Sequence, residues 1–201
     1  MFHLIKRVFI VLLLTGSFWV GTVWADHGFL TEDLIRLHIV GSSDSYEDQQ
    51  IKLKVRDAVI SSLNREMKNL QDPQAAYQYI QDNIPKIQAI ANDALAELGL
   101  DPDAVVTFCR EQFDIRHYDT FSLPSGIYNS LRITLGEGQG KNWWCVVFPQ
   151  ICGTEQDFKE AAAEAGLTEE LAESLETEDG MQLRFYLLDL LGRFEKIVRQ
   201  G

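Results

Sequence analysis

Positive charge is scarce in this sequence. Lysine and arginine together number 18 against 30 aspartate and glutamate residues, which gives a formal net charge of -12. Nucleic acids and anionic lipid surfaces attract proteins through a broad positive field, which this chain lacks. We therefore expect no nucleic-acid partner. The composition, 46% hydrophobic and 24% charged, is that of an ordinary globular protein.

Long apolar runs are also scarce, and the exception lies at the N-terminus. Lys6 and Arg7 precede an apolar segment from Val8 to Val23, and a small residue, Ala25, follows at the position of a signal-peptidase site before Asp26. The run is also nearly long enough to cross a bilayer, so an uncleaved anchor is the alternative. Both interpretations send the rest of the chain across the membrane, because the positive charge precedes the run.

This pattern predicts the organisation of the chain. We expect residues 1–25 to be a signal peptide or a membrane anchor, with any cleavage falling between Ala25 and Asp26. We expect residues 26–201 to form a single exported domain, because no linker or internal repeat divides them. The membrane is then expected to be contacted only through the N-terminal segment.

Cysteine is sparse, and metal-binding spacings are missing. The sequence has no CxxC, no HxxxH and no cluster of histidine and carboxylate residues at ligand spacing, so no metal and no cofactor is expected. The odd number of cysteines, at positions 109, 145 and 152, leaves at least one thiol free or paired outside the chain. Cys145 and Cys152 can form a disulfide if the chain reverses near Pro149. The alternative is that both are small apolar side chains buried on a strand.

A thiol enzyme would need a cysteine activated by a nearby base. Cys145 with His117 or His38 is the candidate pairing, although neither has a recognisable family spacing. Cys145 also lies in an apolar segment, which favours an inert thiol. A secreted thiol-dependent hydrolase acting on the cell wall is therefore the alternative function to be tested, not the favoured one.

Hydrophobic periodicity predicts strand and helices in the first half of the exported part. Residues 34–40 alternate as a strand, with Arg36 and His38 on a face that must meet water or a polar partner. Asp44 is expected to cap an amphipathic helix that continues past residue 60. Asp72 is expected to cap a second helix, which Pro85 breaks.

The second half predicts strands followed by helices. Residues 104–110, 113–118, 126–135 and 143–149 are rich in branched and aromatic side chains, and the last two are expected to pair as an antiparallel hairpin with a long glycine-rich loop. Beyond them, Thr154 with Asp157 is expected to cap a helix, and residues 181–200 are expected to pass from strand into helix near Leu188. The predicted fold class is α+β, with an N-terminal strand and helices, a central antiparallel β-hairpin region and C-terminal helices.

The segment GEGQGKNWWC, residues 136–145, has glycines that suggest a phosphate-binding loop. The Walker pattern needs four residues before Gly-Lys and then a hydroxyl residue and a helix, whereas this chain has three, then Asn142 and an apolar strand. Nucleotide binding is therefore not expected. The loop is still longer than folding requires, and adjacent Trp143 and Trp144 point to opposite faces of a strand. One of them is a candidate for a protein contact.

Two segments together carry a more specific signal. IRLHIVGSSDSYEDQQIKLKVRDAV, residues 35–59, and SGIYNSLRITLGEGQGKNWWCVVFPQIC, residues 125–152, resemble the stage II sporulation protein R family of endospore-forming bacteria. The residues that match the family's first motif are Arg36, His38, Ser43, Asp44, Asp48, Gln49, Lys52, Val55, Arg56 and Asp57. Those that match its second motif are Gly126, Tyr128, Leu131, Arg132, Gly136, Glu137, Gly138, Gly140, Asn142, Trp143, Trp144, Cys145, Phe148, Pro149 and Cys152.

The resemblance implies a signalling protein that is not itself an enzyme. Such a protein is secreted from the forespore into the space between the forespore and mother cell membranes. There it activates a membrane-embedded aspartic protease, which cleaves the precursor of sigma factor E. We expect the outer-facing part of that protease to be the partner. The hypothesised contact residues are Gly136, Glu137, Gly138, Gly140, Asn142, Trp143 and Trp144, with Arg36 and His38 as a second candidate.

Overall fold

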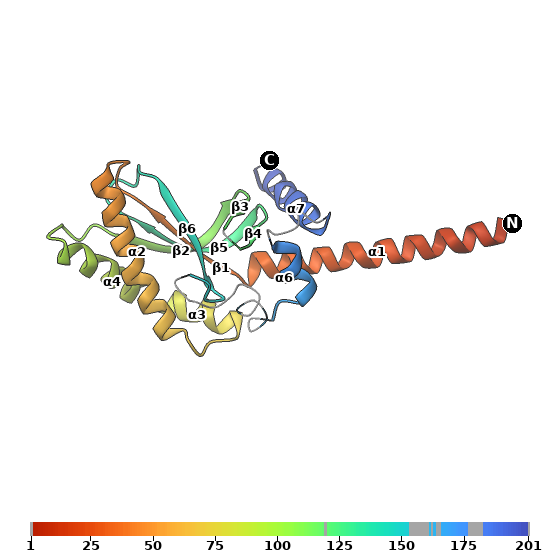
Figure 1. The fold of residues 1–201 in the computed structure, drawn as a ribbon, viewed down its shortest axis with the longest axis horizontal. Helices are drawn as coiled ribbons and strands as arrows, with labels where there is room; N and C mark the ends of the chain where they lie inside the picture. Colours follow the sequence, from red (N-terminus) through yellow and green to blue (C-terminus); the bar gives the residue numbers. More distant parts are fainter. Residues whose placement is uncertain are drawn as a thin grey trace.

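The protein is described by a computed structural model that covers residues 2–118, 120–152, 161, 163, 166–176 and 183–200. One long helix, α1 (Phe2–Glu32), projects from a body made of a sheet and shorter helices (Figure 1). Within its segment His3–Glu32 the most apolar 18-residue window has a mean hydropathy of 2.0, so the helix is long and apolar enough to cross a membrane. The helix continues unbroken through Ala25 and Asp26, and cleavage between them stays a prediction.

The body is built on a mixed four-stranded sheet. Its order is β2-β5-β1-β6, with β1 parallel to β5 and antiparallel to β6, and β2 antiparallel to β5. The strands are β1 (Ile35–Val40), β2 (Val105–Phe113), β5 (Gly126–Thr134) and β6 (Asn142–Phe148). A small second sheet pairs β3 (Arg116–His117) with β4 (Ser122–Leu123).

The predicted hairpin between β5 and β6 is wrong, because β1 lies between these two strands. β1 pairs with a neighbouring strand along both of its edges, which gives its buried backbone groups partners within the sheet. The connection at residues 135–141 must therefore cross the end of β1. This crossing accounts for its length, which exceeds that of a tight turn.

Three helices cover one face of the sheet (Figure 1). They are α2 (Tyr46–Glu66), α3 (Pro73–Asp82) and α4 (Ile84–Glu97). The Asp72 cap and the break near Pro85 are confirmed. The expected cap of α2 is wrong by one residue. The side chain of Ser45 accepts the hydrogen bond from Asp48 N, while that of Asp44 accepts one from Lys141 N. The apolar residues Leu37, Ile39, Leu131 and Ile133 of the sheet belong to the buried core with the inner faces of these helices.

The other face of the sheet is polar but not open. Arg36 is 0% exposed and His38 is 6% exposed, so the expectation that they form an exposed contact surface is wrong. Arg36 lies over the rings of Phe113, at 3.9 Å, and Tyr128, at 4.8 Å. Aromatic faces attract a guanidinium, so the polar partner of Arg36 is supplied by rings within the protein and not by water.

The described C-terminal elements are helical, and the α+β class is confirmed. Thr168 caps α6 (Glu169–Leu175), and α7 runs from Leu183 to Gln200. The strand expected before Leu188 is absent from the described part, because helix already begins at Leu183. The predicted cap at Thr154 and Asp157 lies outside the described residues.

Candidate functional site

The loop from β5 to β6 is bound to the loop that follows β1. Gln139 N donates a hydrogen bond to Ser42 O at 3.1 Å, and Gly140 N donates one to Gly41 O at 2.8 Å. Lys141 N donates to Asp44 Oδ1 at 2.7 Å. We call residues 41–45 and 135–141 the loop clasp. The clasp joins the two sequence segments that carry the family resemblance.

The clasp explains the glycines without a ligand. Gly136 has φ 52° and Gly138 has φ 64°, in the left-handed region that other residues adopt with strain. Gly140 is required for a different reason, since a Cβ there would lie 2.2 Å from Ser43 O. Glu137 is exposed at the tip and accepts a hydrogen bond from Gln139 Nε2 at 3.0 Å. The loop is thus a fixed backbone scaffold that displays a few side chains.

Helix α2 is attached to the clasp through a buried lysine. Lys52 is 4% exposed, and its Nζ donates to Lys141 O at 2.8 Å and to Gln49 Oε1 at 2.6 Å. Gln49 Nε2 in turn donates to Ser43 O at 2.8 Å. Burial lowers the pKa of Lys52 by disfavouring the ammonium form, while the carboxylate of Asp44 opposes this effect. Ionic and amide groups that look like surface residues in the sequence therefore hold the clasp on the helix.

A second polar chain connects the sheet to the end of the clasp. His38 Nδ1 lies 2.9 Å from Glu111 Oε1, and His38 Nε2 lies 2.9 Å from Asn142 Oδ1. Ser130 Oγ donates to Glu111 Oε2 at 2.8 Å. Burial raises the pKa of Glu111, but hydrogen bonds from His38 and Ser130 outweigh it, so the pKa lies below its usual range. His38 is therefore a positioning residue for Asn142 and not a surface contact.

The adjacent tryptophans point to opposite faces of β6, as predicted. Trp144 stacks on His38, with ring centroids 5.6 Å apart, and the guanidinium carbon of Arg116 lies 3.6 Å from its centroid. Trp143 lies on the other face, where the guanidinium carbon of Arg56 is 5.0 Å from its centroid. Both tryptophans are half-buried. Each ring therefore has one side packed against the protein and part of its surface left to solvent.

Of the two alternatives for Cys145 and Cys152, the structure has the disulfide, with the Cα atoms 6.1 Å apart. It forms one wall of an open pocket of about 590 Å³ between α2 and β6. The pocket lining combines residues from both family motifs with neighbours on α2: Arg56, Asp57, Ile60, Ser61, Asn64, Trp143, Cys145 and Cys152. Arg56 is held in place by Asp57, with Nη2 2.6 Å from Oδ1. An aromatic ring, a guanidinium and an amide thus surround one concave, partly apolar surface.

The cysteine-based enzyme hypothesis fails at its nucleophile. The sulfur of Cys145 is bonded to Cys152 and is not a thiol. His117 hydrogen-bonds Ser122 Oγ at 2.8 Å, and His38 is engaged on both ring nitrogens. The free Cys109 is no substitute: although it is exposed, the protein atoms around its sulfur partly desolvate it, and this effect and then the charge of Glu111 raise its pKa and disfavour the thiolate.

Three features of the site were not predicted from the sequence. Glu111 fell between two predicted strand segments, although a charged residue flanked by strand residues is a signal for a polar partner on that face. The pairing of Arg56 with Trp143 depends on the sheet order, which periodicity does not give. Arg36 Nε and Nη1 have no hydrogen-bond partner among the described residues. No sequence pattern predicts this.

Comparison with known proteins points to one family. The model of the family Stage II sporulation protein R (spore_II_R) matches residues 31–158. A protein of Bacillus subtilis (strain 168) named "Stage II sporulation protein R" is 32% identical in an alignment of 182 positions that covers 80% of each chain. No solved structure matches the chain. The matched region contains the clasp, the polar chain through His38 and the pocket between α2 and β6.

Proposed function

Because the chain belongs to the stage II sporulation protein R family, we propose that it is an exported activator of a membrane-embedded aspartic protease that processes the precursor of sigma factor E. In this proposal the protein is made in the forespore and acts in the space between the forespore and mother cell membranes. The apolar N-terminal helix is compatible with export. The protein acts by binding, not by catalysis.

The observation that carries a binding role is the meeting of the two motifs. Lys52 and Lys141 are 89 residues apart in the sequence, yet they are joined by a hydrogen bond at the base of the clasp. The same two segments line the pocket between α2 and β6. The shape of the pocket, its aromatic ring and its fixed cation favour recognition of a protein segment.

The proposed contact surface is divided by role. Glu137 at the clasp tip and Asn142 at its end are exposed and are available to a partner's polar groups. Trp143 and Arg56 provide the pocket wall, where a partner's apolar or acidic side chain would be received. The clasp glycines and His38 contribute by holding these groups in place, and not by touching the partner.

Charge reversal in the pocket tests the proposal. Arg56→Glu should abolish most precursor cleavage when the protein, the protease and the precursor are co-expressed in non-sporulating cells. It removes both the cation and the pairing with Asp57 and Trp143. Lys54→Glu is the matched control, because Lys54 is exposed on the same helix but does not line the pocket.

Several results would count against the proposed function. Normal accumulation of Arg56→Glu with cleavage at the wild-type rate would refute the pocket as the contact surface. If the Glu137→Ala and Asn142→Ala variants still support precursor cleavage at the wild-type rate, the clasp is not part of the contact surface. If the wild-type protein drives no cleavage in these cells, direct activation itself is wrong.

A further inference from the structure

Helix α7 leaves a continuous apolar stripe uncovered. Leu183, Tyr186, Leu190, Phe194 and Ile197 recur at helical spacing and are between 52% and 68% exposed. Val198 extends the stripe at 62% exposed. A stripe of this kind normally faces a core, and its exposure marks a surface that meets an apolar partner.

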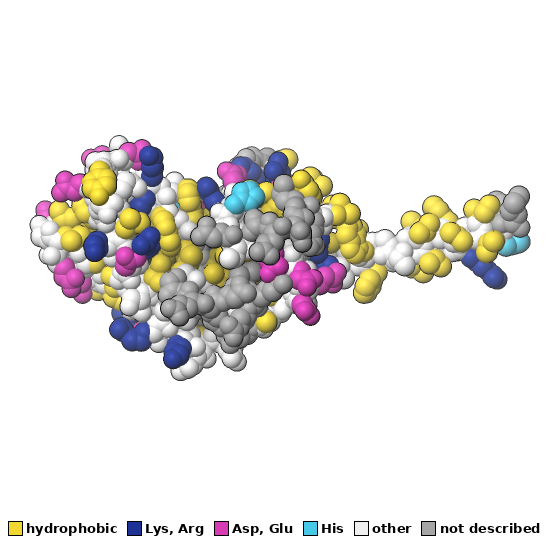
Figure 2. Space-filling view, in the orientation of Figure 1, with side chains coloured by type: hydrophobic (Ala, Val, Ile, Leu, Met, Phe, Trp, Pro, Cys, Tyr) yellow, Lys and Arg dark blue, Asp and Glu magenta, His cyan; other side chains and the backbone are white. Residues whose placement is uncertain are grey.

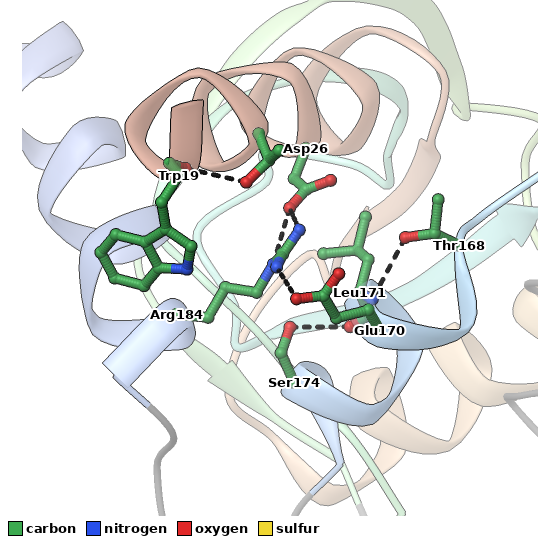
Figure 3. Close-up of polar contacts among 8 residues, drawn as sticks. Trp19, Asp26, Thr168, Glu170, Leu171, Ser174 and Arg184 are labelled. Carbon is green, nitrogen blue, oxygen red and sulfur yellow. Dashed lines mark hydrogen bonds and ion pairs between the residues drawn. The ribbon is translucent and has the colours of Figure 1, made fainter. Parts of the chain in front are cut away.

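The stripe is not exposed because the helix is loosely held. Arg184 at the start of α7 donates Nε to Asp26 Oδ2 of α1 at 2.8 Å and forms an ion pair with Glu170 of α6 (Figure 3). Further along, Ser125 N donates to Asp189 Oδ1 at 3.1 Å. Gly192 lies against Ser125, where a Cβ would be 1.7 Å from the carbonyl oxygen. The opposite side of the helix is thereby fixed to the body, and the stripe is held facing outward.

The stripe continues an apolar surface that belongs to α1. Large hydrophobic side chains of α1 from Leu4 to Trp24 are exposed, and they cover a helix long enough to cross a membrane. Figure 2 shows hydrophobic side chains along α1 and at the neighbouring edge of the body. Trp24 of α1 and Phe194 and Val198 of α7 line the same pocket, of about 340 Å³. The two uncovered surfaces therefore meet where α1 leaves the body.

The charge of α7 differs from that of the rest of the chain. Its sequence, LRFYLLDLLGRFEKIVRQ, holds four basic and two acidic residues, whereas the whole protein carries a net charge of -12. Arg193 is exposed beside the stripe and pairs with Asp189 of the same helix, at 2.7 Å, and the partly exposed Lys196 lies 3.6 Å from the exposed Asp114. Basic residues that flank an apolar stripe are the pattern of helices that lie in the headgroup region of an anionic bilayer.

We propose that α7 is an interfacial membrane helix, with the stripe from Leu183 to Val198 embedded in the surface of the bilayer that α1 enters. The membrane contact predicted for the N-terminal segment alone is then incomplete. The contact of α7 does not depend on α1 remaining attached, so it would keep the body on the membrane after cleavage at Ala25. This inference stands independently of the proposed function.

Fluorophores attached to single cysteines test the proposal on the full chain. In a Cys109→Ser background, Phe194→Cys places the probe within the stripe, and Tyr46→Cys places it at an 81% exposed position on α2 as the matched control. Both variants keep α1 and are reconstituted in vesicles of phosphatidylethanolamine and phosphatidylglycerol. We expect a nitroxide-labelled lipid to quench the probe at 194 several-fold more than the probe at 46, and aqueous iodide to show the reverse order.

Two outcomes would overturn the proposal. Equal quenching at both positions by each agent would show that the stripe stays in water. Protection of the probe at 194 from both agents, together with disulfide formation between two unlabelled Phe194→Cys chains under an added oxidant, would assign the stripe to a second copy instead. Ile197→Cys gives a second probe position on the stripe if Phe194→Cys does not fold.

Discussion

The clasp should be unusually sensitive to a single methyl group at Gly140. A Cβ there would lie 2.2 Å from Ser43 O, 2.6 Å from Ser43 C and 2.9 Å from Gly41 O. All of these are backbone atoms, so no side-chain rotation relieves the clash. Overpacking of this kind costs roughly 1–3 kcal/mol. Separation of the loops would also break the hydrogen bonds from Gly140 N and Gln139 N, worth about 1 kcal/mol each.

Gly140→Ala should therefore lower the free energy of unfolding by about 3 kcal/mol. With a urea dependence of about 2 kcal/mol per molar, the unfolding midpoint should fall by about 1.5 M. Tryptophan fluorescence is the suitable probe, because Trp143 and Trp144 directly follow the clasp. Gly28→Ala is the matched control, since Gly28 has open space around its Cβ position and no positive φ. Equal midpoints for the two variants would refute the close contact between the loops.

Two further predictions concern the groups around the clasp. Glu111→Gln should cost about 2 kcal/mol at neutral pH, because it removes the charge that receives hydrogen bonds from His38 and Ser130. Since the folded pKa of Glu111 lies below the ordinary 4.5, its contribution is complete above that pH and is lost as the pH falls through the lower value. When the pH is lowered from about 7 to about 3, the urea midpoint of the Glu111→Gln variant should thus fall less steeply than that of the wild type. Parallel plots of midpoint against pH for the two proteins would contradict this assignment. Reduction of the Cys145–Cys152 bond, which spans 7 residues, should cost about 2 kcal/mol and slow partner activation. An unchanged unfolding midpoint in the presence of reductant would show that the bond contributes nothing.

Local features of the fold were predictable from the sequence. The Asp72 cap, the break near Pro85 and the amphipathic pattern of α2 depend on residues within a few positions of each other. Two cysteines on either side of Pro149 allowed a disulfide, but the sequence left buried thiols as the alternative, and the structure decides for the bond. In each case a short segment holds all the residues on which the prediction depends.

The sheet order and the buried polar face were not predictable in the same way. Alternation along β5 and β6 says which side chains share a face, but not which strand lies next to which. Arg36 and His38 looked exposed because their partners, Phe113 and Glu111, are supplied by β2, more than 70 residues away in the sequence. The pocket could not be predicted for the same reason, since it forms only where β6 lies next to α2.

The surface formed by the clasp and the pocket is proposed to contact the protease. Photo-crosslinking measures this directly. A crosslinking amino acid placed at Glu137, or at Ser61 on the pocket rim, should form a covalent adduct with the protease in co-expressing cells. The same group at Glu173, an exposed residue of α6, should form none. Precursor cleavage without an adduct at either site, or equal yields at all three positions, would contradict the account.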